Sequence, residues 1–350
     1  MKKWIRLLIM IITSMFIISC SNEEEKNTLN IYTWESFIPD KVIENFEKET
    51  GIKVNVSFYD TNDILMAKLL SGASDQYDIV SPSTDFIEVM IKQNLLEKLD
   101  KSKLGKTFDN LDTDGLKLYE YSRNYDDGLN YSIPYGYFAT GITVNTSVVG
   151  KNYPKDLTIF LDEKYKGSMT LLDDGRELIG MTLQHLGYSS DSSDDKELNE
   201  AKELLIKMKK NIAKFDVAIY GKGLATGEFV VSHGYPDVFY EIEPSEESKF
   251  DYFLPKGAMM YIDNMAILKD SKNKENAYKF LEYLYRPENY VHTFELFRQI
   301  PVVKGITELT DIKPILTKEE VINNAILPKK LSDEAKIKQE KLFNEIKLAK

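Results

Sequence analysis

The first part of the chain alternates between strand and helix patterns. Apolar and polar residues alternate over 29–34 and 52–58, and a short apolar run follows at 77–80, so we expect three strands. Apolar positions recur at helical spacing between and after them, which predicts helices at 42–50, 64–70 and 86–93. Regular alternation of strands and helices is typical of a parallel α/β sheet.

A second series of elements follows residue 131. We expect strands at 139–145, 168–172, 229–231 and 258–262, and helices at 178–186, 196–210 and 274–285. The glycine-rich stretch 221–227 is interpreted as a surface turn, and the tail from residue 332 as a basic helical surface segment. These elements indicate α/β structure on both sides of residue 135, and the sequence shows no internal repeat.

The N-terminus has the pattern of a bacterial lipoprotein leader. Basic residues precede an apolar run at 7–18, which is shorter than the roughly 20 residues that a membrane-spanning helix needs. An apolar Ile17 and a small Ser19 precede Cys20, the single cysteine, as in a lipobox. We therefore expect a lipoprotein signal peptide at 1–19, lipidation of Cys20 and a polar tether at 20–27. The alternative is an ordinary signal peptide or membrane anchor with an unrelated cysteine.

Length and charge narrow the possible functions. The roughly 330 residues after the leader exceed what one hydrophobic core holds efficiently, so two domains are expected. Without residues 1–19 the net charge is −14, which argues against a nucleic-acid partner and leaves cationic ligands open. A single cysteine provides no disulfide framework, so the fold depends on its apolar core.

Residues typical of catalysis are sparse. The three histidines, His185, His233 and His292, are scattered and lack the spacing of metal ligands. The sequence contains no phosphate-binding loop, dinucleotide fingerprint or nucleophile elbow. We therefore expect neither an enzyme nor a cofactor or metal.

Carboxylates and aromatic residues lie instead at the ends of predicted strands, in the segments 34–37, 83–85, 173–177 and 261–263. Open α/β sheets bind ligands at the carboxyl ends of their strands, so these segments are expected to meet in one cleft. Aromatic faces attract an ammonium group by roughly 0.5–2 kcal/mol each, and carboxylates add charge-assisted hydrogen bonds. Such a cleft would suit a primary or secondary amine.

Each segment also has a purely structural interpretation. Asp174 and Glu177 are spaced as in a capping box at the start of a helix. Asp263 would then cap a turn, Trp34 would belong to the core, and the segment 81–83 would be a turn. Only the joint placement of the segments points to a ligand.

A set of sequence blocks occurs in a characteristic order, at 32–39, 46–54, 77–83, 132–135, 141–145, 173–177, 270–277 and 284–287. Together they resemble the spermidine/putrescine-binding proteins of bacterial ABC importers. The resemblance runs from about residue 28 to 305 and fades in the tail. It implies a two-lobed periplasmic-binding-protein fold of type II with the ligand in the interlobe cleft. By analogy, lobe 1 holds 28–135 and 261–300, and lobe 2 holds 136–260 and 301–350.

The resemblance also implies which residues bind the ligand. Asp174, Glu177 and Asp263 match the amine-binding carboxylates of the family, and Ser83 matches a polar contact. The first ligand-contacting segment is formed by Trp34, Glu35, Ser36 and Phe37. Tyr235 and Tyr261 fall where the family usually has tryptophan walls. Asp85 stands where an aromatic residue is common, and Ile300 where a tyrosine is, so the choice between spermidine and putrescine stays open.

The implied function is capture of a polyamine by a lipid-anchored monomer, which delivers it to the membrane permease and ATPase of an ABC importer. The protein would lie in the periplasm or on the outer face of the cell membrane, since a lipobox serves both types of envelope. Two alternatives remain open: the same scaffold with ferric iron or a sugar as ligand, and a lipid-anchored surface enzyme or adhesin.

Overall fold

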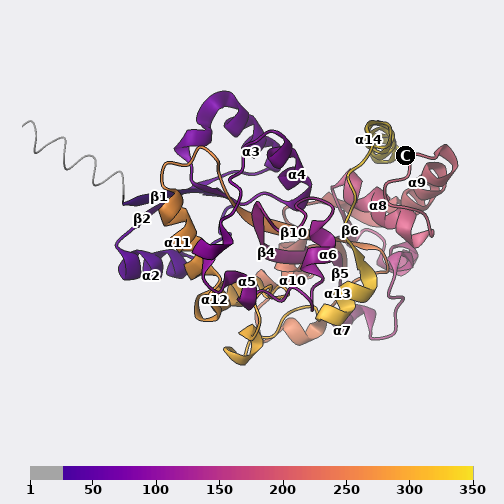
Figure 1. The fold of residues 1–350 in the computed structure, drawn as a ribbon. Helices are drawn as coiled ribbons and strands as arrows, with labels where there is room; N and C mark the ends of the chain where they lie inside the picture. Colours follow the sequence, from indigo (N-terminus) through magenta and orange to yellow (C-terminus); the bar gives the residue numbers. More distant parts are fainter. Residues whose placement is uncertain (1–26, 350) are drawn as a thin grey trace, which may run out of the picture.

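The computed structural model describes residues 27–349, which form two β-sheets flanked by helices (Figure 1). The expected signal peptide, Cys20 and most of the tether lie outside the described residues. The six-stranded sheet consists of β1 (Thr28–Thr33), β2 (Lys53–Phe58), β3 (Ile79–Val80), β4 (Ser132–Ala139), β10 (Ala258–Ile267) and β11 (Ala325–Ile326). The five-stranded sheet consists of β5 (Gly141–Asn145), β6 (Met169–Leu172), β7 (Ile212–Asp216), β8 (Val231–Gly234) and β9 (Phe250–Phe253). We call the six-stranded sheet with its packed core the first lobe, and the five-stranded sheet with its packed core the second lobe.

The first lobe begins with the expected parallel α/β unit. Strand β1 pairs in parallel with β2 on one side and β3 on the other. The helices α2 (Asp40–Thr50), α3 (Asn62–Lys68) and α4 (Thr84–Lys92) follow the three strands, which confirms the predicted order of elements. Gly51 ends α2 with a φ of +71°, and its N–H donates to the Glu47 carbonyl, so the chain can turn into β2. The sheet becomes mixed where β10 pairs antiparallel with β3 and β4.

Two of the three passages of the chain between the lobes lie next to each other. Thr140 alone separates β4 from β5, and its N–H donates to the Met259 carbonyl at 3.0 Å. The chain returns between β9 and β10, so that both passages run side by side. In Figure 1, β4 and β10 lie between the two groups of helices.

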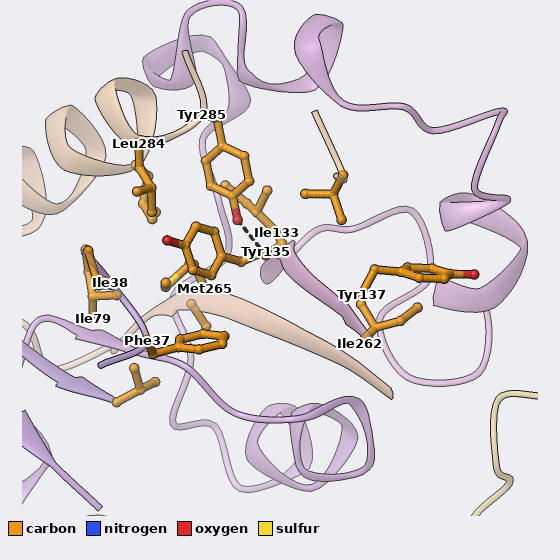
Figure 2. Packing of buried hydrophobic residues seen from close by; sticks show 14 of the residues in the cluster. Phe37, Ile38, Ile79, Ile133, Tyr135, Tyr137, Ile262, Met265, Leu284 and Tyr285 are labelled. Atoms are coloured by element: carbon orange, nitrogen blue, oxygen red, sulfur yellow. Dashed lines mark hydrogen bonds between the residues drawn. The ribbon is translucent and has the colours of Figure 1, made fainter. Parts of the chain in front are cut away.

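The core of the first lobe is rich in tyrosines with partnered hydroxyl groups. Tyr135 is fully buried and meets the ring of Phe37 edge-on, with 5.1 Å between ring centroids. The Tyr285 hydroxyl donates to the Ile133 carbonyl at 2.9 Å (Figure 2). A hydrogen bond of this kind offsets the cost of burying the hydroxyl group while the ring fills the core. This packing fixes β4 beside the segment that follows β1.

The second lobe is covered by α8 (Gly175–His185), α9 (Asp195–Lys209) and α14 (Asp333–Leu348), which lie together in Figure 1. Helix α14 contributes Leu342 and Ile346 to the second core, so it is more than the surface segment expected from the sequence. The boundary proposed for the tail was also wrong. Buried residues of the segment 302–325 belong to the first core, and β11 pairs with the start of β10. Only the end of the chain returns to the second lobe.

Within the described residues, the remaining α-helices are α5 (Thr107–Asn110), α6 (Leu118–Ser122), α7 (Thr146–Val149), α10 (Tyr220–Thr226), α11 (Lys274–Leu284), α12 (Pro287–Phe297) and α13 (Lys318–Asn324). Helix α10 replaces the expected surface turn. Its Gly223 is buried, and a Cβ there would lie 2.2 Å from the Phe229 ring, so the close packing requires a glycine. Within residues 27–349, no helix combines the length and the apolar character needed to cross a membrane.

Candidate ligand-binding site

A cavity of about 690 Å³ is lined by residues of both lobes. Its volume falls within the range of small-molecule sites, roughly 300–1,000 Å³. Ten of the eleven predicted ligand residues line it: Trp34, Glu35, Ser36, Phe37, Ser83, Asp85, Asp174, Tyr235, Tyr261 and Asp263. Glu177 does not. The four segments selected from the sequence therefore meet in space.

The parallel pairing of β1 and β3 brings two of these segments together. Trp34 directly follows β1, and its indole N–H donates to the carbonyl of Ser81, just after β3, at 2.8 Å. The Trp34 ring also packs against Tyr59, with 4.6 Å between ring centroids. These contacts fix the indole as a wall of the cavity, so Trp34 has both the structural and the lining role considered for it.

The sequence placed Asp263 at the end of a strand, whereas it lies in the interior of β10. The pairing with β4 shifts at this point: Asp263 lies opposite Gly136, whereas Asn264 lies opposite Pro134. A bulge of this kind redirects a side chain out of the regular ladder. The Ser83 hydroxyl donates to Asp263 Oδ1 at 2.5 Å. Burial raises the pKa of Asp263 to about 6, with a further rise from the nearby charge of Asp85, while the Ser83 hydrogen bond opposes the rise.

Asp174 combines the two roles considered for it. Its side chain caps α8 by accepting the N–H of Glu177 at 3.0 Å, and it also lines the cavity. The reciprocal half of the predicted capping box is absent among the described contacts, because the Glu177 carboxylate turns to the hydroxyls of Thr140 and Tyr261. The helix start therefore holds Asp174 at the cavity wall.

Two tyrosines from different lobes form an aromatic pair in the lining, Tyr235 after β8 and Tyr261 on β10. The rings of Tyr235 and Tyr261 lie 6.3 Å apart with an angle of 59° between their planes. The Tyr235 N–H donates to the Tyr220 hydroxyl at 3.1 Å, and that hydroxyl donates to Asp237 at 2.5 Å. The segment after β8 is thereby fixed against α10.

The cavity is strongly acidic. Seven carboxylates line it, those of Glu35, Asp60, Asp63, Asp85, Asp174, Asp237 and Asp263. Its lining, taken over residues 27–349, includes no lysine or arginine. Burial is the main cause of the raised pKa of both Asp85 and Asp237, and a neighbouring carboxylate raises each further. The described residues contain no group of three or more histidine, cysteine or acidic side chains placed to hold a metal ion. The arrangement favours an organic cation.

Sequence reasoning missed several lining residues. Residues 60–63 come directly after β2, and the parallel pairing of β1 with β2 brings them to the same edge. The strand pattern at 52–58 contained this signal, because the end of that strand was equally a candidate. Also missed were Phe86, Phe138, Pro236, Asp237, Tyr240 and Phe297. Phe138 lies in β4 and Phe297 ends α12, two segments that the sequence did not single out as ligand-binding.

Residues 41–324 match the model of the family of bacterial extracellular solute-binding proteins. The chain is 36% identical over 292 residues to the spermidine/putrescine-binding periplasmic protein of Escherichia coli K12, covering 82% of this chain and 81% of that protein. It is 34% identical over 304 residues to the putrescine-binding periplasmic protein SpuD of Pseudomonas aeruginosa, covering 82% of each. These matches span both lobes.

Solved structures agree in fold over almost the whole chain. The Tp0655 (TpPotD) lipoprotein of Treponema pallidum superposes with a TM-score of 0.83 at 28% identity, covering 92% of this chain and all of that one. The spermidine/putrescine transporter substrate-binding protein PotD of Streptococcus pneumoniae gives 0.80 at 26% identity, covering 92% and 99%. The two-lobed α/β architecture is therefore shared with these binding proteins.

Proposed function

Because the chain belongs to the family of bacterial extracellular solute-binding proteins, we propose that it captures a polyamine in the cavity between its lobes. The observation that carries this proposal is the lining itself: seven carboxylates with aromatic rings and, in the part of the chain described, no basic side chain. Spermidine and putrescine, which appear in the names of the relatives, are flexible chains with cationic amines. Their charge and their methylene groups both find complementary surfaces here.

In this proposal each lobe contributes a carboxylate that binds the ligand. Asp263 from the first lobe and Asp174 from the second bind ammonium groups through charge-assisted hydrogen bonds. The rings of Trp34, Tyr235 and Tyr261 pack against the methylene chain and the ammonium ends. Further carboxylates, such as Glu35 and Asp85, extend the negative potential along the cavity.

Closure of the lobes around the ligand follows from this division. Asp263 lies on β10 of the first lobe and Asp174 lies between β6 and α8 of the second, so one ligand can bond to both only when the lobes approach. A ligand that binds the closed form more tightly shifts the equilibrium toward it. The passages at Thr140 and at residues 254–257, together with residues 327–332 between β11 and α14, are the segments that would absorb the hinge motion.

We further propose that the protein is anchored by a lipid on Cys20 and delivers its ligand to the permease and ATPase of an ABC importer. The lipobox at 17–20 supports this anchoring. The test is metabolic labelling with a radioactive fatty acid in cells that express the protein or its Cys20→Ala variant. Label in the wild type and none in the variant is the expected result. Equal labelling of both would refute lipidation at Cys20.

The ligand itself is tested through the fluorescence of Trp34. Trp4 and Trp34 are the only tryptophans, so the chain from residue 21 onward reports on the cavity wall alone. The protein is unfolded and refolded to remove bound ligand, then titrated with putrescine, spermidine, spermine and a neutral sugar. A saturable change at submicromolar concentration of one polyamine is expected. The proposal fails if millimolar polyamine leaves the emission unchanged, or if only the sugar changes it.

A further inference from the structure

One ion pair joins the two lobes outside the cavity. Arg298, which directly follows α12, donates from Nη1 to Glu247 Oε1 at 2.6 Å. Glu247 lies in the segment between β8 and β9, so the pair connects the first lobe to the second. Among the ion pairs that residues 27–349 form with one another, it is the only one that crosses between the lobes.

The segment that carries Glu247 is anchored in the second lobe. Its residues Val238 and Ile242 share a buried core cluster with Leu172 of β6. Strand β9 begins at Phe250, shortly after Glu247, and pairs with β5. The carboxylate of Glu247 therefore moves with the second lobe when the lobes separate.

Arg298 is fixed to the first lobe. Its φ of +50° lies in the left-handed region, which ends α12 and turns the chain away from the helix axis. The Arg298 carbonyl accepts the N–H of Ile315 at 3.0 Å, and its Nε donates to the Lys313 carbonyl at 3.3 Å. Ile315 packs against the first core. These bonds orient the planar guanidinium so that Nη1 meets the carboxylate of the other lobe.

The ion pair lies beside the cavity wall and is partly shielded from water. Only 23% of the Arg298 side chain and 26% of the Glu247 side chain are exposed, so salt screens the pair less than a surface pair. The Arg298 guanidinium also lies 5.8 Å from the centre of the Phe239 ring. The adjacent residues Tyr240 and Phe297 both line the cavity, with 6.4 Å between their ring centroids. Opening of the lobes would separate all of these partners.

We infer that Arg298 and Glu247 are positioning residues that form an interlobe latch, which holds the closed form without touching the ligand. The bond contributes free energy only while the lobes are together, so it shifts the equilibrium toward the closed form. The apparent affinity of a ligand scales with the population of the form that binds it. Because release requires opening, the latch should act mainly by slowing dissociation. The inference deepens the proposed polyamine binding and rests on it.

Two neighbouring glutamates offer a matched test. Glu247→Ala removes the interlobe bond, and polyamine affinity should fall about three- to tenfold, mainly through faster dissociation in stopped-flow measurements of Trp34 fluorescence. Glu246 pairs with Lys249 inside the same segment of the second lobe. Glu246→Ala therefore removes the same charge one position away, and affinity should stay within about twofold of the wild type. Glu247→Lys, which places like charges across the lobes, should weaken binding more than Glu247→Ala.

A double-mutant cycle isolates the bond between the two side chains. Arg298→Ala also removes the bond to the Lys313 carbonyl, so its single effect includes a change within the first lobe. The double variant should bind polyamine within about twofold of Arg298→Ala, because the second substitution has no bond left to break. Circular dichroism and urea unfolding check that each variant folds, and Arg298→Gln takes its place in the cycle if the alanine variant does not.

Small-angle X-ray scattering adds a measurement that a purely local role would not affect. Glu247→Ala should need more polyamine than the wild type to reach the compact form, and should reach the same radius of gyration at saturation. Equal affinity and dissociation rate of Glu247→Ala and the wild type would overturn the latch, as would multiplicative effects in the double variant; polyamine binding by the wild type would then still stand. A wild type that binds no polyamine would refute the proposed function, and the inference with it.

Discussion

The hydroxyl of Ser83 donates to Asp263 Oδ1 at 2.5 Å, although 180 residues separate the two in the chain. An isolated backbone bridge also joins them, at the point where β10 bulges. The bond favours the charged form of a carboxyl whose pKa burial has raised to about 6. Ser83 therefore helps to keep Asp263 ionised in a site that would otherwise favour its protonation.

Replacing Ser83 with alanine should weaken polyamine binding through Asp263. Loss of the hydroxyl raises the pKa of Asp263 further and leaves one carboxylate oxygen without its donor. We expect affinity at neutral pH to fall about three- to tenfold. Calorimetry measures the effect, and Ser71→Ala at an exposed serine of the same lobe is the control. Equal affinity of wild type and Ser83→Ala would show that the hydroxyl is unimportant.

Asp263→Asn should have opposite effects on binding and on stability. The neutral amide loses a charge-assisted bond to the ligand, and affinity should fall about tenfold or more. Without ligand, the free energy of unfolding of the variant at neutral pH should be about 1–3 kcal/mol higher than that of the wild type, because the unfavourable buried charge is gone. Urea titration without ligand measures this gain. A variant that is both less stable and unchanged in affinity would contradict the role given to Asp263.

Polyamine affinity should decline as pH falls through about 6, where Asp263 takes up a proton. At about one pH unit below this pKa only about a tenth of the carboxyl is charged, so this group alone should cost about tenfold in affinity. Titrations across this range in wild type and Asp263→Asn isolate its contribution, because Asp85 and Asp237 also have raised pKa values. Parallel pH profiles of the two proteins would rule out Asp263 as the group that titrates.

Without ligand, the pH dependence of this group has the opposite sign. The folded state binds the proton of Asp263 more tightly than the unfolded state, in which the carboxyl has its ordinary pKa of 3.8. Its contribution to stability is therefore present in acid and is lost as pH rises through about 6. The Asn variant should lack this loss.

Helix α14 should stabilise the second lobe through its buried face. Ile346 is 0% exposed and Ile337 is 66% exposed, so one helix offers a matched pair of substitutions. Ile346→Ala should lower the free energy of unfolding by about 2–4 kcal/mol, whereas Ile337→Ala should change it by less than about 0.5 kcal/mol. Chemical denaturation measures both. Similar values for the two variants would mean that α14 is not part of the core.

The sequence contained most of the fold and much of the candidate site. Hydrophobic periodicity predicted the β1–α4 unit because its strands and helices bury one regular face each. The resemblance to spermidine/putrescine-binding proteins is confirmed by the family match and the relatives. Strand ends selected Trp34 and Ser83 because parallel strands present their carboxyl ends at one edge.

Other features depended on long-range packing that no local pattern contains. The bulge at Asp263 arises from the register between β10 and β4, which only the paired strands define. Glu177 has the spacing of a capping residue, but its side chain turns toward hydroxyls from two distant segments. Ile300 stands where the family commonly has a tyrosine. It is buried in the first core and does not line the cavity, so this difference affects ligand binding at most indirectly.

The most direct test of the acidic cavity compares two ligands of the same length. Putrescine carries two ammonium groups, and 1,4-butanediol replaces them with neutral hydroxyls on the same chain of four methylene groups. Calorimetric titration of the refolded wild type should give saturable binding of putrescine and at least about 100-fold weaker binding of the diol, since two charge-assisted bonds are lost. Comparable affinity for both ligands would contradict the claim that the carboxylates select a cation.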